Sequence, residues 1–155
     1  MTSKYQCAGT ASVGTAAINE VVALLWNPHA SKPLWVREIW YCKTGTTADY
    51  LKICRATSTG TLPATSSVTP DIDNDRDRML APGTGAMLYL GHFVNGEPAL
   101  NASVLSRHAL PSATGSGFIC IFDYPIRVGP GEGLAVASST TTAPQPADVT
   151  FVWEE

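Results

Sequence analysis

The strongest constraint on the fold lies in residues 117–155, GFICIFDYPIRVGPGEGLAVASSTTTAPQPADVTFVWEE. Apolar runs flank GPGEG at 129–133, and this composition predicts a chain reversal, because proline fixes φ and glycine can adopt positive φ. In the final run, Val149, Phe151 and Trp153 occupy every second position, the period of a half-buried strand. A strand that reaches the last residue needs a sheet to hold it, since loose termini fray. We therefore expect this segment to close an all-β core.

Further apolar runs between turn residues predict strands at 15–26, 34–44, 50–57, 86–93 and 118–123. The 15–26 run also has helical periodicity, but its adjacent valines and the Asn27-Pro28 turn that follows favour a strand. The 34–44 run is the clearest strand of the first half, and 50–57 is expected to be its hairpin partner. The total is about eight short strands with no convincing helix.

Two long stretches, 58–85 and 94–117, lack periodicity and are rich in turn-forming residues. Irregular loops of this length are usually functional or docked on something. With 155 residues the chain has the size of one domain. We therefore predict a single-domain β-sandwich over 15–155, jelly-roll-like with two long irregular loops, and residues 1–14 as an N-terminal arm or edge strand.

The composition favours a protein whose surface is covered by partners. Hydrophobic residues make up 45% of the chain and charged residues only 15%, below the ~25% typical of soluble domains. The net charge of −3 argues against a general nucleic-acid binder, which needs Lys and Arg to displace counterions. No signal peptide or membrane-spanning run is visible, so we expect folding in a cytoplasm and no membrane partner.

The 34–44 strand predicts where such partners bind. Strict alternation gives it two apolar faces, one of Leu34, Val36, Trp40 and Cys42 and the other of Trp35, Ile39 and Tyr41. We expect a second sheet to cover one face and a neighbouring subunit the other, which predicts a homo-oligomer, with a trimer preferred. The candidate interface residues are Trp35, Trp40, Tyr41, Asp71, Asp73, Arg76 and Arg78.

The segment DIDNDRDR offers a weak metal candidate. Asp71, Asp73 and Asp75 have the oxygen-ligand spacing of a calcium loop. However, Arg76 replaces the glycine that makes the sharp turn, and Pro82 stands where the bidentate glutamate belongs. A charged loop that is solvated or contacts another subunit is the preferred interpretation, and no metal is expected.

No motif predicts catalysis or a cofactor. The histidines, His29, His92 and His108, lie outside any H-E-x-x-H motif, no serine lies in G-x-S-x-G, and Cys120 lies in a run typical of a packed strand. The cysteines, Cys7, Cys42, Cys54 and Cys120, are far apart. They are expected to be buried reduced thiols, with a disulfide formed after release as the alternative. The four tryptophans fit core or interface packing better than a sugar platform.

Three segments, LLWNPHASKPLWVREIW, PIRVGPGEGLAV and VTFVWEE, resemble small virion structural proteins of tailed bacteriophages. The resemblance implies a jelly roll or related β-sandwich, often trimeric, on a capsid or tail surface, and it brings no catalytic residue. We therefore expect a non-enzymatic virion protein, with a capsid decoration (cement) protein that contacts the major capsid protein as first choice. The alternatives are a tail or fibre-attachment protein and a receptor-binding or carbohydrate-binding virion protein.

Overall fold

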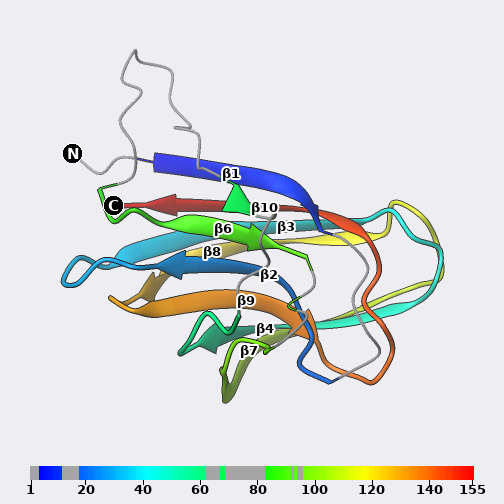
Figure 1. Cartoon of the computed structure of the whole chain (residues 1–155). Coiled ribbons are helices and arrows are strands. Elements are labelled where there is room, and N and C mark those ends of the chain that lie inside the picture. Colours follow the sequence, from blue (N-terminus) through cyan, green and yellow to red (C-terminus); the bar gives the residue numbers. More distant parts are fainter. Residues whose placement is uncertain (1–3, 12–17, 62–66, 69–82, 92, 94–95) are drawn as a thin grey trace.

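The computed structural model describes residues 4–11, 18–61, 67–68, 83–91, 93 and 96–155, and these residues contain no helix. They form two antiparallel sheets that pack face to face (Figure 1). The strands are β1 (Lys4–Ala11), β2 (Val21–Asn27), β3 (Leu34–Lys43), β4 (Asp49–Ala56), β5 (Ser67–Val68), β6 (Met87–Leu90), β7 (Leu100–Leu110), β8 (Gly117–Val128), β9 (Glu132–Ser138) and β10 (Ala147–Glu154).

The order of the strands is that of a jelly roll. Sheet A has the order β1-β10-β3-β8, and sheet B has the order β5-β6-β2-β9-β4-β7. When β5 and β6 are set aside, β1 pairs with β10, β2 with β9, β3 with β8 and β4 with β7. This nested pairing of the first half of the chain with the second is the double Greek key of a jelly roll. The predicted all-β sandwich is therefore confirmed.

The C-terminal strand lies inside sheet A, between β1 and β3. Val149, Phe151 and Trp153 are fully buried between the sheets. The Trp153 ring stacks on Tyr5 of β1, with 5.8 Å between the ring centroids. The segment expected to close the core does so, and β2 confirms a strand rather than a helix in the early apolar run.

The expected hairpin between 34–44 and 50–57 is wrong. β3 pairs with β10 and β8 in sheet A, whereas β4 pairs with β7 and β9 in sheet B. The turn at 44–48 therefore crosses from one sheet to the other. Sequence neighbours are separated because each strand pairs with one from the opposite half of the chain.

The predicted faces of β3 are also wrong beyond Val36. On β10, Val152 and Trp153 are consecutive, but their partners on β3 are Glu38 and Val36, so Arg37 is an extra residue in β3. Such a bulge reverses the alternation of side chains after it. The inner face consequently consists of Leu34, Val36, Ile39, Tyr41 and Lys43, and the outer face carries Trp35, Trp40 and Cys42.

The second predicted loop, 94–117, is largely regular structure. β7 occupies Leu100–Leu110, and a short turn leads into β8 at Gly117. Strand β7 lacks a clear apolar period because it is the edge of sheet B and leaves Asn101, Ala102 and Ser103 exposed. In the first predicted loop, 58–85, β5 pairs with β6, and residues 62–66 and 69–82 lie outside the described part of the chain.

A second apolar cluster covers the outer face of sheet B. Phe93 and Leu100 pack there with side chains of β2, β4 and β9. The backbone segments 57–61 and 96–99 run together beside this cluster, with a hydrogen bond of 2.8 Å from Thr57 N to Ala99 O. At their crossing Gly60 has φ of 60°, and a Cβ on Gly60 would collide with the Gly96 carbonyl oxygen. Sheet B is thus apolar on both faces.

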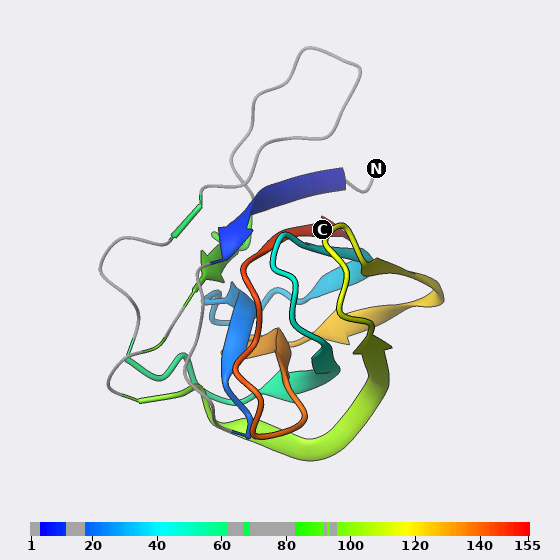
Figure 2. The same ribbon diagram turned by 90° about the vertical axis from the view of Figure 1, so that its right-hand side faces the viewer.

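The end of the sandwich seen in Figure 2 is held by a buried lysine. Lys43 is fully buried. Its Nζ donates to the carbonyl oxygen of Thr47 at 2.6 Å and to that of Pro111, while Thr44 N donates to Pro146 O at 2.7 Å. These three bonds join the β3–β4, β7–β8 and β9–β10 turns, and the two made by Lys43 Nζ compensate the burial of that polar group.

Candidate functional site

The outer face of sheet A differs from that of sheet B because no described segment forms an apolar cluster over it. Large apolar side chains are instead exposed there. Trp40 on β3 is 44% exposed, and Ile119 and Ile121 on β8 are 62% and 70% exposed. Trp35 lies on the same face, further along β3. Contiguous exposed apolar side chains of this kind mark binding surfaces.

The strand register brings these residues together. Trp40 lies opposite Ile119 on β8 and opposite Thr150 on β10, and Glu38 lies opposite Ile121. Directly opposed side chains in antiparallel strands have Cβ atoms about 5 Å apart. Trp40, Ile119 and Ile121 therefore form one continuous patch, called here the Trp40 patch.

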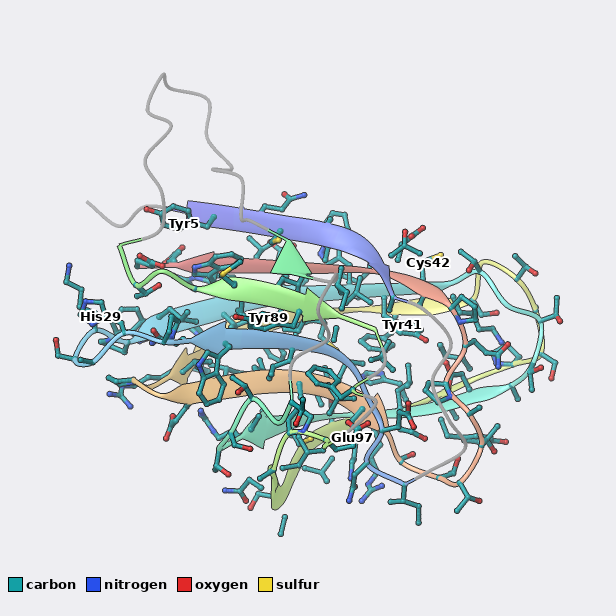
Figure 3. All side chains as sticks on the ribbon, viewed as in Figure 1. Tyr5, His29, Tyr41, Cys42, Tyr89 and Glu97 are labelled. Atoms are coloured by element: carbon teal, nitrogen blue, oxygen red, sulfur yellow. The ribbon has the colours of Figure 1, made fainter. Side chains whose placement is uncertain are left out.

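A shallow depression of about 590 Å³ lies beside the patch. Its lining residues are Trp40, Tyr41, Cys42, Gly115, Gly117, Phe118, Ile119, Asp148 and Thr150. Figure 3 labels Tyr41 and Cys42, which leave β3 on opposite sides, Cys42 outwards. Gly117 lies opposite Cys42, and a Cβ there would collide with the Tyr41 carbonyl oxygen. Glycine is therefore required at 117, and its missing side chain contributes to the hollow.

Three polar side-chain pairs surround the patch, although Arg37 Nε is buried without a hydrogen-bond partner. Trp40 Nε1 donates to Glu38 Oε2 at 2.9 Å, which fixes the indole ring. Thr10 Oγ1 donates to Asp148 Oδ1 at 2.7 Å. Arg37 donates to Glu154 at 2.9 Å, and this hydrogen bond raises the pKa of Arg37. A partner that covers this face would meet apolar surface beside three side-chain pairs that are already hydrogen-bonded.

Ser106, His108 and Cys120 form a second cluster, at the side of the sandwich. His108 Nε2 lies 3.0 Å from Ser106 Oγ and 3.4 Å from Cys120 Sγ. Burial lowers the pKa of His108 and raises the pKa of the Cys120 thiol, the latter opposed by a hydrogen bond to Ser106. Both shifts favour the neutral side chains. A nucleophilic cysteine needs the opposite, a thiolate beside a cation, so these shifts disfavour Cys120 as a nucleophile.

The predicted interface residues fall in three places. Trp35 and Trp40 both lie exposed on the outer face of sheet A, although strict alternation had placed them on opposite faces of the strand. The prediction for Tyr41 is wrong: its side chain is buried, its hydroxyl donates to Asp49 Oδ2 at 2.7 Å, and burial above all raises its pKa. The bulge at Arg37 turned Tyr41 inwards. The remaining candidates, Asp71, Asp73, Asp75, Arg76 and Arg78, lie outside the described residues.

The other candidate ligands are dispersed. His29 Nδ1 accepts backbone N–H bonds from Ser31 and Lys32 in the β2–β3 turn, and His92 lies outside the described residues. Within the described ranges no three His, Cys, Asp or Glu side chains gather as metal ligands. The cysteines are all free thiols; burial raises the pKa of Cys7 to about 11, but Cys42 is exposed, contrary to the expectation that all are buried.

Sequence reasoning missed Ile119 and Ile121. FICIF was interpreted as a packed strand, but its apolar residues alternate between an inward set and an outward set, as in 34–44. Two adjacent strands with apolar residues on both faces were the available signal.

The described part of the chain has no helix of the length and apolarity needed to cross a bilayer. Comparison with protein-family models, curated proteins and solved structures finds no match.

Proposed function

We propose that this protein is a non-enzymatic structural protein of a tailed-bacteriophage virion, with capsid decoration as its first role. Two lines of support combine. Three segments resemble small phage virion proteins, and the jelly roll carries an apolar outer face that nothing described covers. The Trp40 patch is the observation that carries the proposal. A partner protein that covers it would bury apolar surface, and the patch side chains themselves carry no catalytic group.

The patch would stabilise a shell by burial of its side chains. Fully burying one exposed isoleucine contributes roughly 1.5–3 kcal/mol, and tryptophan is among the residues most enriched at the centres of interfaces. Trp40 is already fixed by Glu38, so little rotamer freedom is lost on docking. Several copies joined together would bind a repeating capsid surface more tightly than one copy does, through effective concentration.

The test uses particles that lack the protein. Such particles are expected to assemble but to break at a lower temperature than wild-type particles, and adding the purified protein should restore their heat resistance. Trp40→Ala should weaken this rescue, while Tyr50→Ala, which removes a similarly exposed aromatic ring from sheet B, should leave it intact. Deletion particles that are as heat-resistant as wild type but do not adsorb to host cells would refute the decoration role.

A carbohydrate-binding role is the second candidate, because exposed Trp40 and Asp148 both line the shallow depression. Sugars stack on tryptophan and hydrogen-bond to carboxylates in such hollows. Trp40 Nε1 and Asp148 Oδ1, however, already bond to Glu38 and Thr10, which favours a protein partner. Binding on a glycan array that Trp40→Ala abolishes would support this second role; an array without signal would count against it.

A tail or fibre-attachment role would use the same Trp40 patch. Locating the protein in a virion reconstruction distinguishes a tail position from capsid decoration.

A further inference from the structure

The free edge of β8 is unusually open to strand pairing. β8 is the last strand of sheet A, and no described strand pairs with its outer side. Edge strands are normally protected by lysine, proline, inward charges or bulges. The second half of β8 has Asp123, Pro125 and an irregular pairing with β3, but residues 117–122 have none of these.

Two other edge strands, β7 and β1, are better protected. β7, at the edge of sheet B, carries Arg107 and has two register shifts against β4. β1, at the far edge of sheet A, carries Lys4, Gln6 and Thr10 on its outer face. Of these three edges, the half-strand 117–122 is therefore the one most suited to pairing with another chain.

The backbone register shows which residues would pair. Lys43 directs its N–H and C=O towards residues 115 and 116, and in an antiparallel ladder every second residue does the same. Ile39 therefore directs its backbone groups towards Cys120, its partner on β8. The backbone groups of Ile119 and Ile121 consequently point away from β3, towards the free edge.

We propose that two copies of this chain pair through residues 117–122 in an antiparallel, two-fold arrangement centred on Cys120. Ile119 of each copy then lies opposite the partner's Ile121, so that the most exposed isoleucines on this face cover each other. The two sheets A join into one continuous sheet, and the Trp40 patches of both copies become adjacent. This proposal does not rest on the proposed virion role, although Ile119 and Ile121 belong to the Trp40 patch that carries that role.

Side-chain chemistry selects both the partner and the register. An axis at Cys120 places Asp123 opposite the partner's Gly117, away from any other charge. An axis at Ile121 would instead oppose Asp123 to Ile119, and an axis at Ile119 would oppose Ile121 to Gly117. Pairing of β8 with β1 of another copy would place Ile119 and Ile121 opposite small or polar residues of β1. It would also leave one β1 edge and one β8 edge unpaired, and further copies could add to these edges.

The first experiment measures the oligomeric state of the full-length protein by sedimentation. We expect a dimer at micromolar concentration. Ile121→Lys should raise the dimer dissociation constant at least tenfold without changing the circular dichroism spectrum, because Ile121 is 70% exposed. Leu105→Lys, at a 43% exposed site on β7, is the matched control and should dimerise normally. A wild-type monomer, a trimer, or a dimer unaffected by Ile121→Lys would each overturn the proposal.

The second experiment tests the register. Opposed residues in the proposed pair have Cα atoms about 4.5–5.5 Å apart, within the range of roughly 4.4–6.8 Å that a disulfide spans. In a Cys42→Ser background, oxidation with copper phenanthroline should cross-link two copies through Cys120. The cross-link should disappear in Cys42→Ser/Cys120→Ser and in Cys42→Ser/Ile121→Lys. A dimer that does not cross-link through Cys120 would overturn the two-fold axis at this residue.

Discussion

The rings of His108 and Phe118 are nearly parallel, with an interplanar angle of 11° and 3.8 Å between their centroids. His108 belongs to β7 in sheet B and Phe118 to β8 in sheet A. Phe118 also stacks on Tyr41, at 5.4 Å. The stack therefore joins the two sheets along the side where neither β7 nor β8 has a further neighbour among the described strands.

This contact predicts a loss of stability on acidification. Burial lowers the pKa of His108 in the folded protein, so the unfolded chain takes up the proton first as the pH falls below about 6.5. Well above pH 6.5 the histidine is uncharged in both states and makes no contribution to the pH dependence. Unfolding in urea between pH 7.5 and pH 5 should show the decrease, and His108→Gln should reduce it. An unchanged pH dependence in His108→Gln would contradict the prediction.

Trp153→Ala is expected to cost the fold a large share of its stability. Replacing a buried tryptophan by alanine typically costs about 3–5 kcal/mol, a large share of the ~5–15 kcal/mol that stabilises a domain, and the stack on Tyr5 would also be lost. Thermal unfolding of the soluble fraction is the measurement. Trp40→Ala is the control, because its exposed ring should leave the melting temperature nearly unchanged. Equal melting temperatures for wild type and Trp153→Ala would contradict the central position of β10.

Tyr41→Phe is expected to destabilise the protein by about 1 kcal/mol, the usual net contribution of one hydrogen bond, because Asp49 Oδ2 keeps a second donor, Gln145 N at 3.2 Å. The lost hydroxyl donates to Asp49 Oδ2 at 2.7 Å, and Asp49 is fully buried. The measurement is the free energy of unfolding in urea. Tyr50→Phe, at an exposed site in β4, should be neutral, and a similar loss in both variants would argue against a specific role for the Tyr41 hydroxyl.

Asn27→Ala should loosen the turns at the other end of the sandwich. Asn27 Nδ2 donates to the carbonyl oxygens of Lys32 at 2.9 Å and Gly129 at 3.2 Å, and Asn27 Oδ1 accepts from His29 N at 3.1 Å. Losing these bonds should cost about 2 kcal/mol. Asn27→Asp should cost more, because a carboxylate would then face carbonyl oxygens. Thermal unfolding of both variants is the test, and an aspartate variant as stable as wild type would contradict it.

The sequence by itself determined which segments become strands wherever the local pattern was strong. In the last strand, Val149, Phe151 and Trp153 alternate, and a period of two is a property of the strand itself. The Asn27-Pro28 turn and the GPGEG turn were equally readable, since proline and glycine restrict or extend φ at their own positions. For the candidate site, the same alternation predicted apolar side chains on both faces of 34–44, but it placed Trp35 and Trp40 on opposite faces.

Only the tertiary structure decided how these strands pair and which way their side chains point. β3 and β4 separate because each finds its partner in the other half of the chain, which no local pattern encodes. One extra residue, Arg37, turns Tyr41 into the core and Trp40 out of it. β7 is a strand because β4 supplies its hydrogen bonds, although its own side chains are largely exposed. Ile119 and Ile121 join Trp40 in one patch because long-range backbone pairing sets the register that brings them together.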